Sequence, residues 1–177
     1  MNKTAKEFFI ILSASILIGI IANSLSSKGI GLIRDDGNRY AIDTAAVKNE
    51  FDIKKRGKLN KAGFHEPVNI PVEAAKQLFD ENAKFIDGRE AFEFNEGRIK
   101  GAANIPYKEF KDKTIEEKME IMKDLKKELI IVSYCSSDSC EMSIDNAYEM
   151  AKAGYNDVKI YLGGYKEWNK MGYPTEK

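Results

Sequence analysis

The stretch LIIVSYCSSDSCEMS, residues 129–143, decides the fold class of this chain. Its first part, Leu129–Tyr134, is the most apolar run of the C-terminal region, and it is short and rich in β-branched residues. Such a run predicts a central parallel strand that is covered on both faces. A small, polar loop follows, and a helix is expected to begin near Cys140 or Glu141. The stretch therefore predicts a strand, loop and helix unit of an α/β domain.

Segments on both sides of this run alternate between the two periodicities. Strands are expected at 68–70, 84–87, 102–106 and 158–164, and helices at 72–82, 90–97, 114–128, 141–155 and 165–172. This alternation predicts a mostly parallel sheet with helices on both faces. In the helix at 114–128, the side chains expected to face inward are Ile115, Met119, Met122 and Leu125. Ligands of such sheets bind at the carboxyl ends of the strands, so the residue after the central strand, Cys135, lies where a site is expected.

Composition excludes two classes of site. The 28 Lys and Arg residues balance the 28 Asp and Glu residues, which leaves no electrostatic case for a nucleic-acid partner. The chain has two cysteines and one histidine, too few for the four ligands of a structural zinc site within one chain. We therefore expect no metal and no organic cofactor. Cys135 and Cys140 remain either one working sulfur with a bystander or a pair.

The N-terminus differs in kind from the rest. Lys3 and Lys6 precede a stretch without charge, in which residues 8–25 are long enough to approach the span of a bilayer core. An uncleaved membrane anchor at 1–27 is the preferred interpretation, and a cleaved signal peptide is the alternative. The two lysines favour a cytoplasmic N-terminus, which places a connector at 28–66 and a domain at 67–177 outside the cell membrane. With a cleaved signal, the domain would instead be secreted.

The loop after the central strand has the chemistry of an anion site. The segment Ser136–Ser139 is small and polar, and the amides at the start of the next helix carry partial positive charge. A Cys135 thiolate held there has a lowered pKa, because only the charged form gains. The loop amides would also hold a second sulfur as a persulfide anion. The alternative is a buried cysteine that only packs in the core.

Two longer motifs carry a resemblance to a known family. Residues 86–106, IDGREAFEFNEGRIKGAANIP, resemble the rhodanese-like signature, and residues 154–168, GYNDVKIYLGGYKEW, are similar to its closing motif. The matching residues of the first motif are Asp87, Arg89, Glu93, Phe94, Gly97, Ile99, Gly101, Ala102, Asn104, Ile105 and Pro106. The resemblance covers about residues 68–175. It implies a five-stranded, mostly parallel sheet flanked by helices, and a sulfurtransferase without cofactors.

By that resemblance, the site is the six-residue loop. Cys135 would be the nucleophile that accepts sulfane sulfur as a persulfide. The substrate-binding cradle would consist of Ser136, Ser137, Asp138, Ser139 and Cys140. The donor would be a small sulfur compound or a protein persulfide, and the acceptor a thiol or another nucleophile. We expect structural roles, through charged hydrogen bonds, for Asp87 and Arg89.

The loop departs from the family pattern C-x-x-G-x-R in two places, Asp138 and Cys140. Related phosphatases and arsenate reductases resemble C-x5-R, and Glu141 at the final place argues against phosphate chemistry. A carboxylate about 6 Å from the thiolate costs roughly 2.8 kcal/mol at an effective dielectric of 20 and about 0.7 kcal/mol in water. A helix terminus contributes about 0.3–1 kcal/mol, up to about 2 when partly buried. An inward Asp138 would therefore slow the nucleophile, whereas an outward Asp138 would cap the helix.

Cys140 leaves the function open between three interpretations. In the first, the chain is a sulfurtransferase and Cys140 is either inert or a resolving thiol that attacks a persulfide on Cys135. In the second, the domain is a non-catalytic binding module. In the third, it is a redox protein that uses both thiols.

Overall fold

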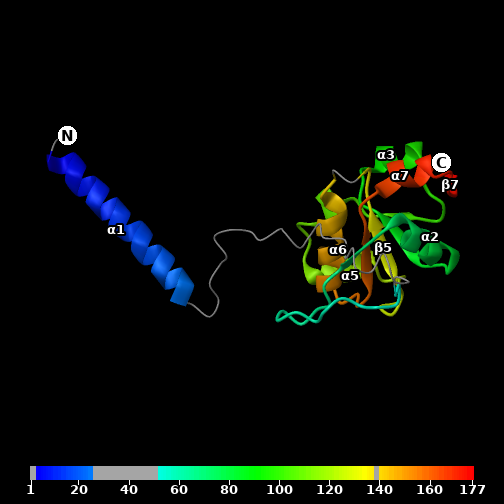
Figure 1. The fold of residues 1–177 in the computed structure, drawn as a ribbon, viewed down its shortest axis with the longest axis horizontal. Coiled ribbons are helices and arrows are strands. Elements are labelled where there is room, and N and C mark those ends of the chain that lie inside the picture. Colours follow the sequence, from blue (N-terminus) through cyan, green and yellow to red (C-terminus); the bar gives the residue numbers. More distant parts are fainter. Residues whose placement is uncertain (1–2, 26–51, 138–139) are drawn as a thin grey trace. The chain divides into compact units, whose positions relative to one another are not determined.

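The computed structural model describes residues 3–25, 52–137 and 140–177, and the chain divides into two units at residue 36. The second unit contains a five-stranded parallel sheet in the order β1, β6, β5, β2, β4 (Figure 1). Its strands are β1 (Val68–Ile70), β2 (Lys84–Asp87), β4 (Ala103–Asn104), β5 (Ile131–Tyr134) and β6 (Val158–Tyr161). The predicted central strand is thus the middle strand, and the predicted five-stranded parallel sheet is confirmed.

Helices cover both faces of this sheet. They are α2 (Val72–Asp80), α3 (Ala91–Glu96), α4 (Tyr107–Phe110), α5 (Ile115–Ile121), α6 (Met142–Lys152) and α7 (Gly164–Lys170). Figure 1 shows β5 between α6 on one side and α2 on the other. One core lies between the sheet and α4, α5 and α6, and includes Ile131 of β5. The other core lies on the side of α2 and α7 and includes Val132 and Trp168. Successive residues of β5 therefore point to opposite cores, as the pleat requires.

The helix predicted at 114–128 is shorter, and its buried face differs from the expectation. It begins with a capping box, in which Thr114 and Glu117 bond each other's backbone N–H groups, and ends at Ile121. Met122 is buried as expected, but Ile115 is 49% exposed and Met119 is 38% exposed. Lys118 is buried instead: its Nζ lies 5.6 Å from the centre of the Phe110 ring and donates a hydrogen bond to Glu149. A long amphipathic side chain took the place expected for the methionine.

The sequence pattern did not indicate the small second sheet. In it, β3 (Arg98–Ile99) pairs antiparallel with β7 (Thr175–Glu176). Arg98 Nε donates a hydrogen bond to Glu176 at 2.9 Å, and the guanidinium of Arg98 stacks over the Phe94 ring. The C-terminus is thereby attached beside α3.

The described end of the expected connector, residues 52–66, packs on the domain. Ile53 is buried in the core on the α2 side, and Phe64 meets the Tyr148 ring edge-to-face at 6.4 Å. The backbone pairs Leu59 with His65, and His65 Nδ1 lies 2.8 Å from the carbonyl oxygen of Gly57. These contacts attach the segment at the amino ends of the strands, away from the cysteine loop.

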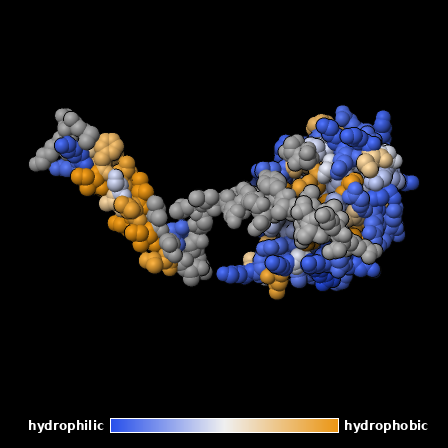
Figure 2. All heavy atoms as spheres, in the orientation of Figure 1, coloured by the Kyte–Doolittle hydropathy of each residue, from blue (hydrophilic) through white to orange (hydrophobic). Residues whose placement is uncertain are grey.

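The first unit contains one described helix, α1 (Lys3–Leu25). Within it, Ala5–Asn23 is long and apolar enough to cross a membrane, and a signal sequence would have the same properties. Figure 2 shows the contrast between its largely hydrophobic surface and the mostly hydrophilic surface of the second unit.

Candidate active site in the loop after the central strand

The cysteine loop leaves the carboxyl end of β5 and leads into α6, as the sequence predicted. Cys135 follows directly on Tyr134 and is 1% exposed. The structure describes Ser136, Ser137 and Cys140 of the predicted cradle, and it brings them together with Cys135. Asp138 and Ser139 lie outside the described residues, so the predicted orientation of Asp138 and the full ring of amides stay predictions.

Cys135 and Cys140 are joined by a disulfide in this structure, and their Cα atoms are 6.4 Å apart. The Sγ of Cys135 also lies 3.5 Å from the carbonyl oxygen of Cys140. The N–H of Cys140 donates to the carbonyl oxygen of Ser137 at 3.0 Å. Carbonyl oxygens carry partial negative charge and repel a thiolate, so this is the arrangement of the oxidised loop.

The first turn of α7 holds the outer side of the loop. The backbone N–H of Tyr165 donates to the carbonyl oxygen of Cys135 at 2.8 Å, and that of Lys166 donates to the carbonyl oxygen of Ser136 at 3.0 Å. This contact requires Gly164, which has φ of +61° and would place a Cβ 2.5 Å from the carbonyl oxygen of Cys135. Because α7 bonds two successive carbonyl groups of the loop, the first turn of this helix sets their orientation.

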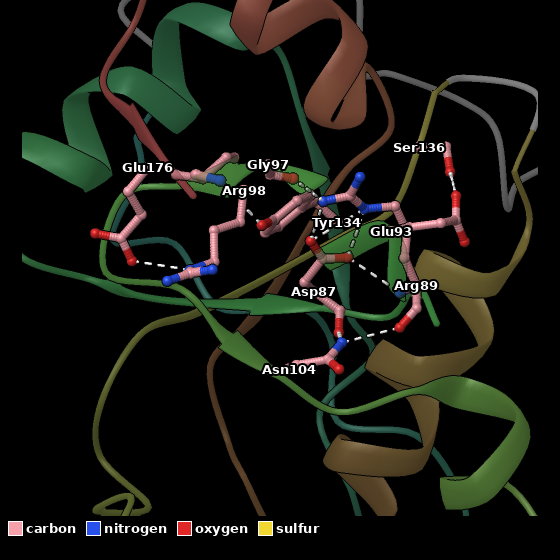
Figure 3. A network of polar contacts seen from close by, with 10 residues as sticks. Asp87, Arg89, Glu93, Gly97, Arg98, Asn104, Tyr134, Ser136 and Glu176 are labelled. Atoms are coloured by element: carbon pink, nitrogen blue, oxygen red, sulfur yellow. Dashed lines mark hydrogen bonds and ion pairs between the residues drawn. The ribbon is translucent and has the colours of Figure 1, made fainter. Parts of the chain in front are cut away.

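A carboxylate of α3 contacts the loop from another side. The hydroxyl of Ser136 donates to Oε1 of Glu93 at 3.2 Å (Figure 3). Glu93 lies in the first turn of α3, a short helix in which no residue is buried. The residue next to Cys135 is thus bonded through its carbonyl to α7 and through its side chain to α3.

A buried ion pair supports both helices. Arg89 Nε donates to both carboxylate oxygens of Asp87, at 3.0 and 3.1 Å, and Nη2 donates to Asp87 at 2.6 Å and to the carbonyl oxygen of Gly97 at 2.7 Å. The guanidinium also lies 4.7 Å from the centre of the Tyr165 ring. The charged hydrogen bonds expected of Asp87 and Arg89 are present, and they connect β2, the end of α3 and α7 (Figure 3).

The charge states of this network follow from burial. Burial lowers the pKa of Arg89, but the hydrogen bonds and charge of Asp87 outweigh it and raise that pKa above its ordinary value. Burial, with the charge of Asp87, also raises the pKa of Tyr134, so its hydroxyl stays neutral. Tyr134 accepts a hydrogen bond from the N–H of Ile99 at 3.2 Å. Asp87 is therefore paired with Arg89, which stays positively charged.

The start of α6 holds Cys140. Ser143 Oγ donates to the carbonyl oxygen of Cys140 at 3.4 Å, and Ser133 Oγ of β5 donates to the carbonyl oxygen of Ser143 at 2.9 Å. The second cysteine is therefore attached to the central strand through two hydroxyl groups. Among the described residues, no group of three or more His, Cys, Asp or Glu side chains is arranged to hold a metal ion.

Sequence reasoning missed the contacts of α7 with the loop. They are made by the backbone N–H groups of Tyr165 and Lys166, and such contacts cannot be recognised from the residue types in a sequence. The Gly163-Gly164 pair was the available signal, because glycine at positive φ permits a close approach of two backbones. The bond between Glu93 and Ser136 was missed because its partners are 43 residues apart.

Comparisons with known proteins agree with this geometry. The sequence model of the rhodanese-like domain family matches residues 71–171, which include the whole cysteine loop. Thiosulfate sulfurtransferase 16, chloroplastic, from Arabidopsis thaliana is 29% identical over 115 residues, which cover 62% of this chain and 93% of that protein. Thiosulfate sulfurtransferase GlpE from Actinobacillus succinogenes is 29% identical over 109 residues, 60% of this chain and 86% of that protein.

A solved structure shares the fold. The BH2092 protein from Bacillus halodurans aligns with a TM-score of 0.52 at 23% identity, covering 62% of this chain and 76% of that one. At this identity the likeness concerns the arrangement of strands and helices alone.

Proposed function

The chain belongs to the rhodanese-like domain family, and on that premise we propose that it is a sulfurtransferase that carries sulfane sulfur as a persulfide on Cys135. The observation that supports this most is the place of Cys135, at the carboxyl end of the central strand and at the start of the loop that leads into an 11-residue helix. Relatives named thiosulfate sulfurtransferases, each 29% identical to this chain over more than 100 residues, also support the proposal.

The proposed transfer has two balanced steps. The Cys135 thiolate attacks the outer sulfur of the donor, the donor's S–S bond breaks, and the leaving group takes the electron pair. An acceptor thiolate then attacks the outer sulfur of the persulfide and releases the Cys135 thiolate. Neither step needs a metal or an organic cofactor, since sulfur is both nucleophile and leaving group.

The oxidised loop cannot start this reaction. In the disulfide, Cys135 has no thiolate, and its sulfur faces a carbonyl oxygen. Reduction by a dithiol must come first, and the loop then has to turn N–H groups toward Cys135. The amides at the start of α6 would favour the resulting anion.

A second candidate function is dithiol redox chemistry, and the closeness of the two cysteines favours it. Their Cα separation of 6.4 Å lies within the range of about 4.4–6.8 Å that a disulfide requires. A persulfide on Cys135 would be attacked by the Cys140 thiol, which forms the disulfide and releases hydrogen sulfide. An external dithiol would then restore both thiols. The remaining alternative is a binding module without turnover.

We place the domain outside the cytoplasmic membrane, attached through residues 8–25. The apolar stretch Ala5–Asn23 and the lysines before it support this proposal. The sulfur donor and the thiol acceptor would then be met in a compartment where disulfides persist.

Mass spectrometry of the full-length chain in detergent tests these functions. The reduced protein is incubated with thiosulfate or inorganic polysulfide, and the peptide that contains Cys135 is analysed. We expect a gain of one sulfur atom, which Cys135→Ser abolishes and Cys140→Ser retains. If the native chain instead ends two hydrogens lighter than the reduced chain, because the added sulfur has left as hydrogen sulfide, and Cys140→Ser does not, the result would support the resolving thiol. No adduct with either donor would leave only the binding module.

A further inference from the structure

Glu93 places a negative charge beside the cysteine loop. Its carboxylate bonds the hydroxyl of Ser136, the residue directly after the proposed nucleophile. Glu93 is partly exposed, so its charge acts on an anion that approaches this side of the loop from solvent. The bond keeps the carboxylate beside the loop instead of leaving it free in solvent (Figure 3).

The neighbouring cation, Arg89, attracts Glu93 through space, but this attraction is a smaller cause of the raised pKa of Arg89 than the bonds and charge of Asp87. Arg89 directs its donors to Asp87 and to the carbonyl oxygen of Gly97, and Asp87 balances its charge. Lys108 is paired with Glu90, 3.1 Å away. In residues 52–137 and 140–177, no lysine or arginine forms an ion pair with Glu93.

The loop itself adds no positive charge. Between Tyr134 and Ser143 the sequence contains Asp138 and Glu141 but no lysine or arginine. The family pattern has arginine at the place of Cys140, and that cation would have compensated Glu93. Other charged groups on these two helices include the exposed Lys166 and the partly exposed Glu167 of α7 and the exposed Glu96 of α3.

We propose that Glu93 is a specificity-determining residue that selects against doubly charged sulfur donors such as thiosulfate and favours singly charged or neutral ones. This inference rests on the proposed persulfide chemistry at Cys135. Each additional negative charge on the donor, about 6 Å from a carboxylate, slows the reaction by about threefold in water and by more where solvent is partly excluded.

A matched pair of donors tests the proposal. Thiosulfate is a dianion and benzenethiosulfonate is a monoanion, and both transfer their outer sulfur to a thiolate, with sulfite or benzenesulfinate leaving. We measure the second-order rate constant of persulfide formation on the reduced full-length chain. Glu93→Gln keeps an oxygen that accepts the Ser136 hydroxyl but removes the charge. Glu96→Gln removes an exposed charge from the same helix and serves as the control.

The expected result is a change in preference between donors. In Glu93→Gln, the ratio of the thiosulfate rate to the thiosulfonate rate rises at least about threefold, whereas Glu96→Gln changes it by less. Added salt accelerates thiosulfate more than thiosulfonate in the native chain, because it screens repulsion, and this difference shrinks in Glu93→Gln. Damage to the fold would lower both rates together and leave the ratio unchanged.

Two results would overturn the inference in distinguishable ways. If both donors form the persulfide and Glu93→Gln leaves their ratio and salt response unchanged, Glu93 does not set specificity, and the sulfurtransferase function stands. If neither donor modifies Cys135 in the native chain, the proposed function fails and the inference fails with it.

Discussion

Two buried ion pairs, one at the carboxyl ends and one at the amino ends of the strands of the same sheet, have the same spacing in the sequence and different consequences. Asp87 is the last residue of β2 and Arg89 follows it, whereas Asp157 and Lys159 span the amino end of β6. All four side chains are at most 6% exposed. Each pair thus removes two charges from water, and each needs further hydrogen bonds to offset that cost.

The difference lies in what each cation holds besides its acid. Arg89 reaches Gly97 and stacks on Tyr165, so it connects the helices that contact the cysteine loop. Lys159 Nζ donates to the carbonyl oxygen of Lys55 at 2.7 Å and so attaches the segment before β1. The planar guanidinium makes several directed bonds at once, whereas the ammonium acts as a point charge. The ion pair at the carboxyl ends of the strands therefore supports the site, and the ion pair at the amino ends attaches the segment before β1.

The largest effect is expected from breaking the pair at the site. Arg89→Met leaves the carboxylate of Asp87 buried without a cation, so we expect a loss of about 3–5 kcal/mol in the free energy of unfolding, measured with urea. The rate of persulfide formation per folded molecule should fall as well, because Tyr165 loses its support. The double variant Asp87→Leu/Arg89→Met should recover part of the stability but not the rate. A loss below about 1 kcal/mol in the single variant would contradict this account.

Breaking the pair at the amino ends of the strands should lower the stability of the domain without changing the reaction at Cys135. Among the described residues, Lys159→Met leaves Asp157 with Arg56 as its remaining cation, whose Nε is 3.9 Å from that carboxylate, so we expect a loss of about 3 kcal/mol. The segment at 52–56 should become more accessible to proteolysis. The rate of persulfide formation on Cys135 should not change. If that rate fell equally in Lys159→Met and Arg89→Met, the two ion pairs would not differ in their effect on the site.

A glycine pair isolates the contact between α7 and the loop. Gly164→Ala introduces a side chain at positive φ and places it against the carbonyl oxygen of Cys135, so we expect a loss of about 2–3 kcal/mol and a slower reaction at Cys135. Gly172→Ala has a similar φ of +68° but meets no atom within 4 Å. It should cost about 1 kcal/mol through backbone strain alone and leave the reaction rate unchanged. Equal rates in the two variants would show that the close approach at Gly164 does not position the loop.

The smallest effect concerns a cluster of three charges, in which Glu149 is paired with the buried Lys118 and the exposed Lys152. Burial alone would raise the pKa of Glu149, but hydrogen bonds from the two lysines lower it below its ordinary value. A lowered folded pKa means that the contribution to stability is present above the unfolded pKa and is lost as pH falls through the folded value. Glu149→Gln should therefore cost up to about 1 kcal/mol near pH 7, and the difference from the native chain should vanish in acid. Urea titrations at neutral and acidic pH check this; a difference that grows on acidification would contradict the sign.

The site at the carboxyl ends of the strands was largely predictable, because the sequence features that indicate it are local. The apolar run at 129–134 marked the middle strand, and a cysteine after such a strand marked the loop. Asp87 and Arg89 are two residues apart, and the motif around them led us to expect charged hydrogen bonds from both; that they bond each other was seen in the structure. The second sheet, with its two-residue strands, has too few residues to show a period.

The sequence by itself determined the order of strands and helices, the parallel sheet and the place of Cys135 in it, because apolar periodicity and chain connectivity are local properties. Only the tertiary structure decided that Lys118 is buried and Met119 exposed, that α7 holds the carbonyls of the loop, and that Glu93 bonds Ser136. Each of these depends on atoms that are distant in the chain, and in the α7 contacts the bonding groups are backbone N–H groups that every residue except proline carries. Close packing selects such contacts only when the whole domain is assembled.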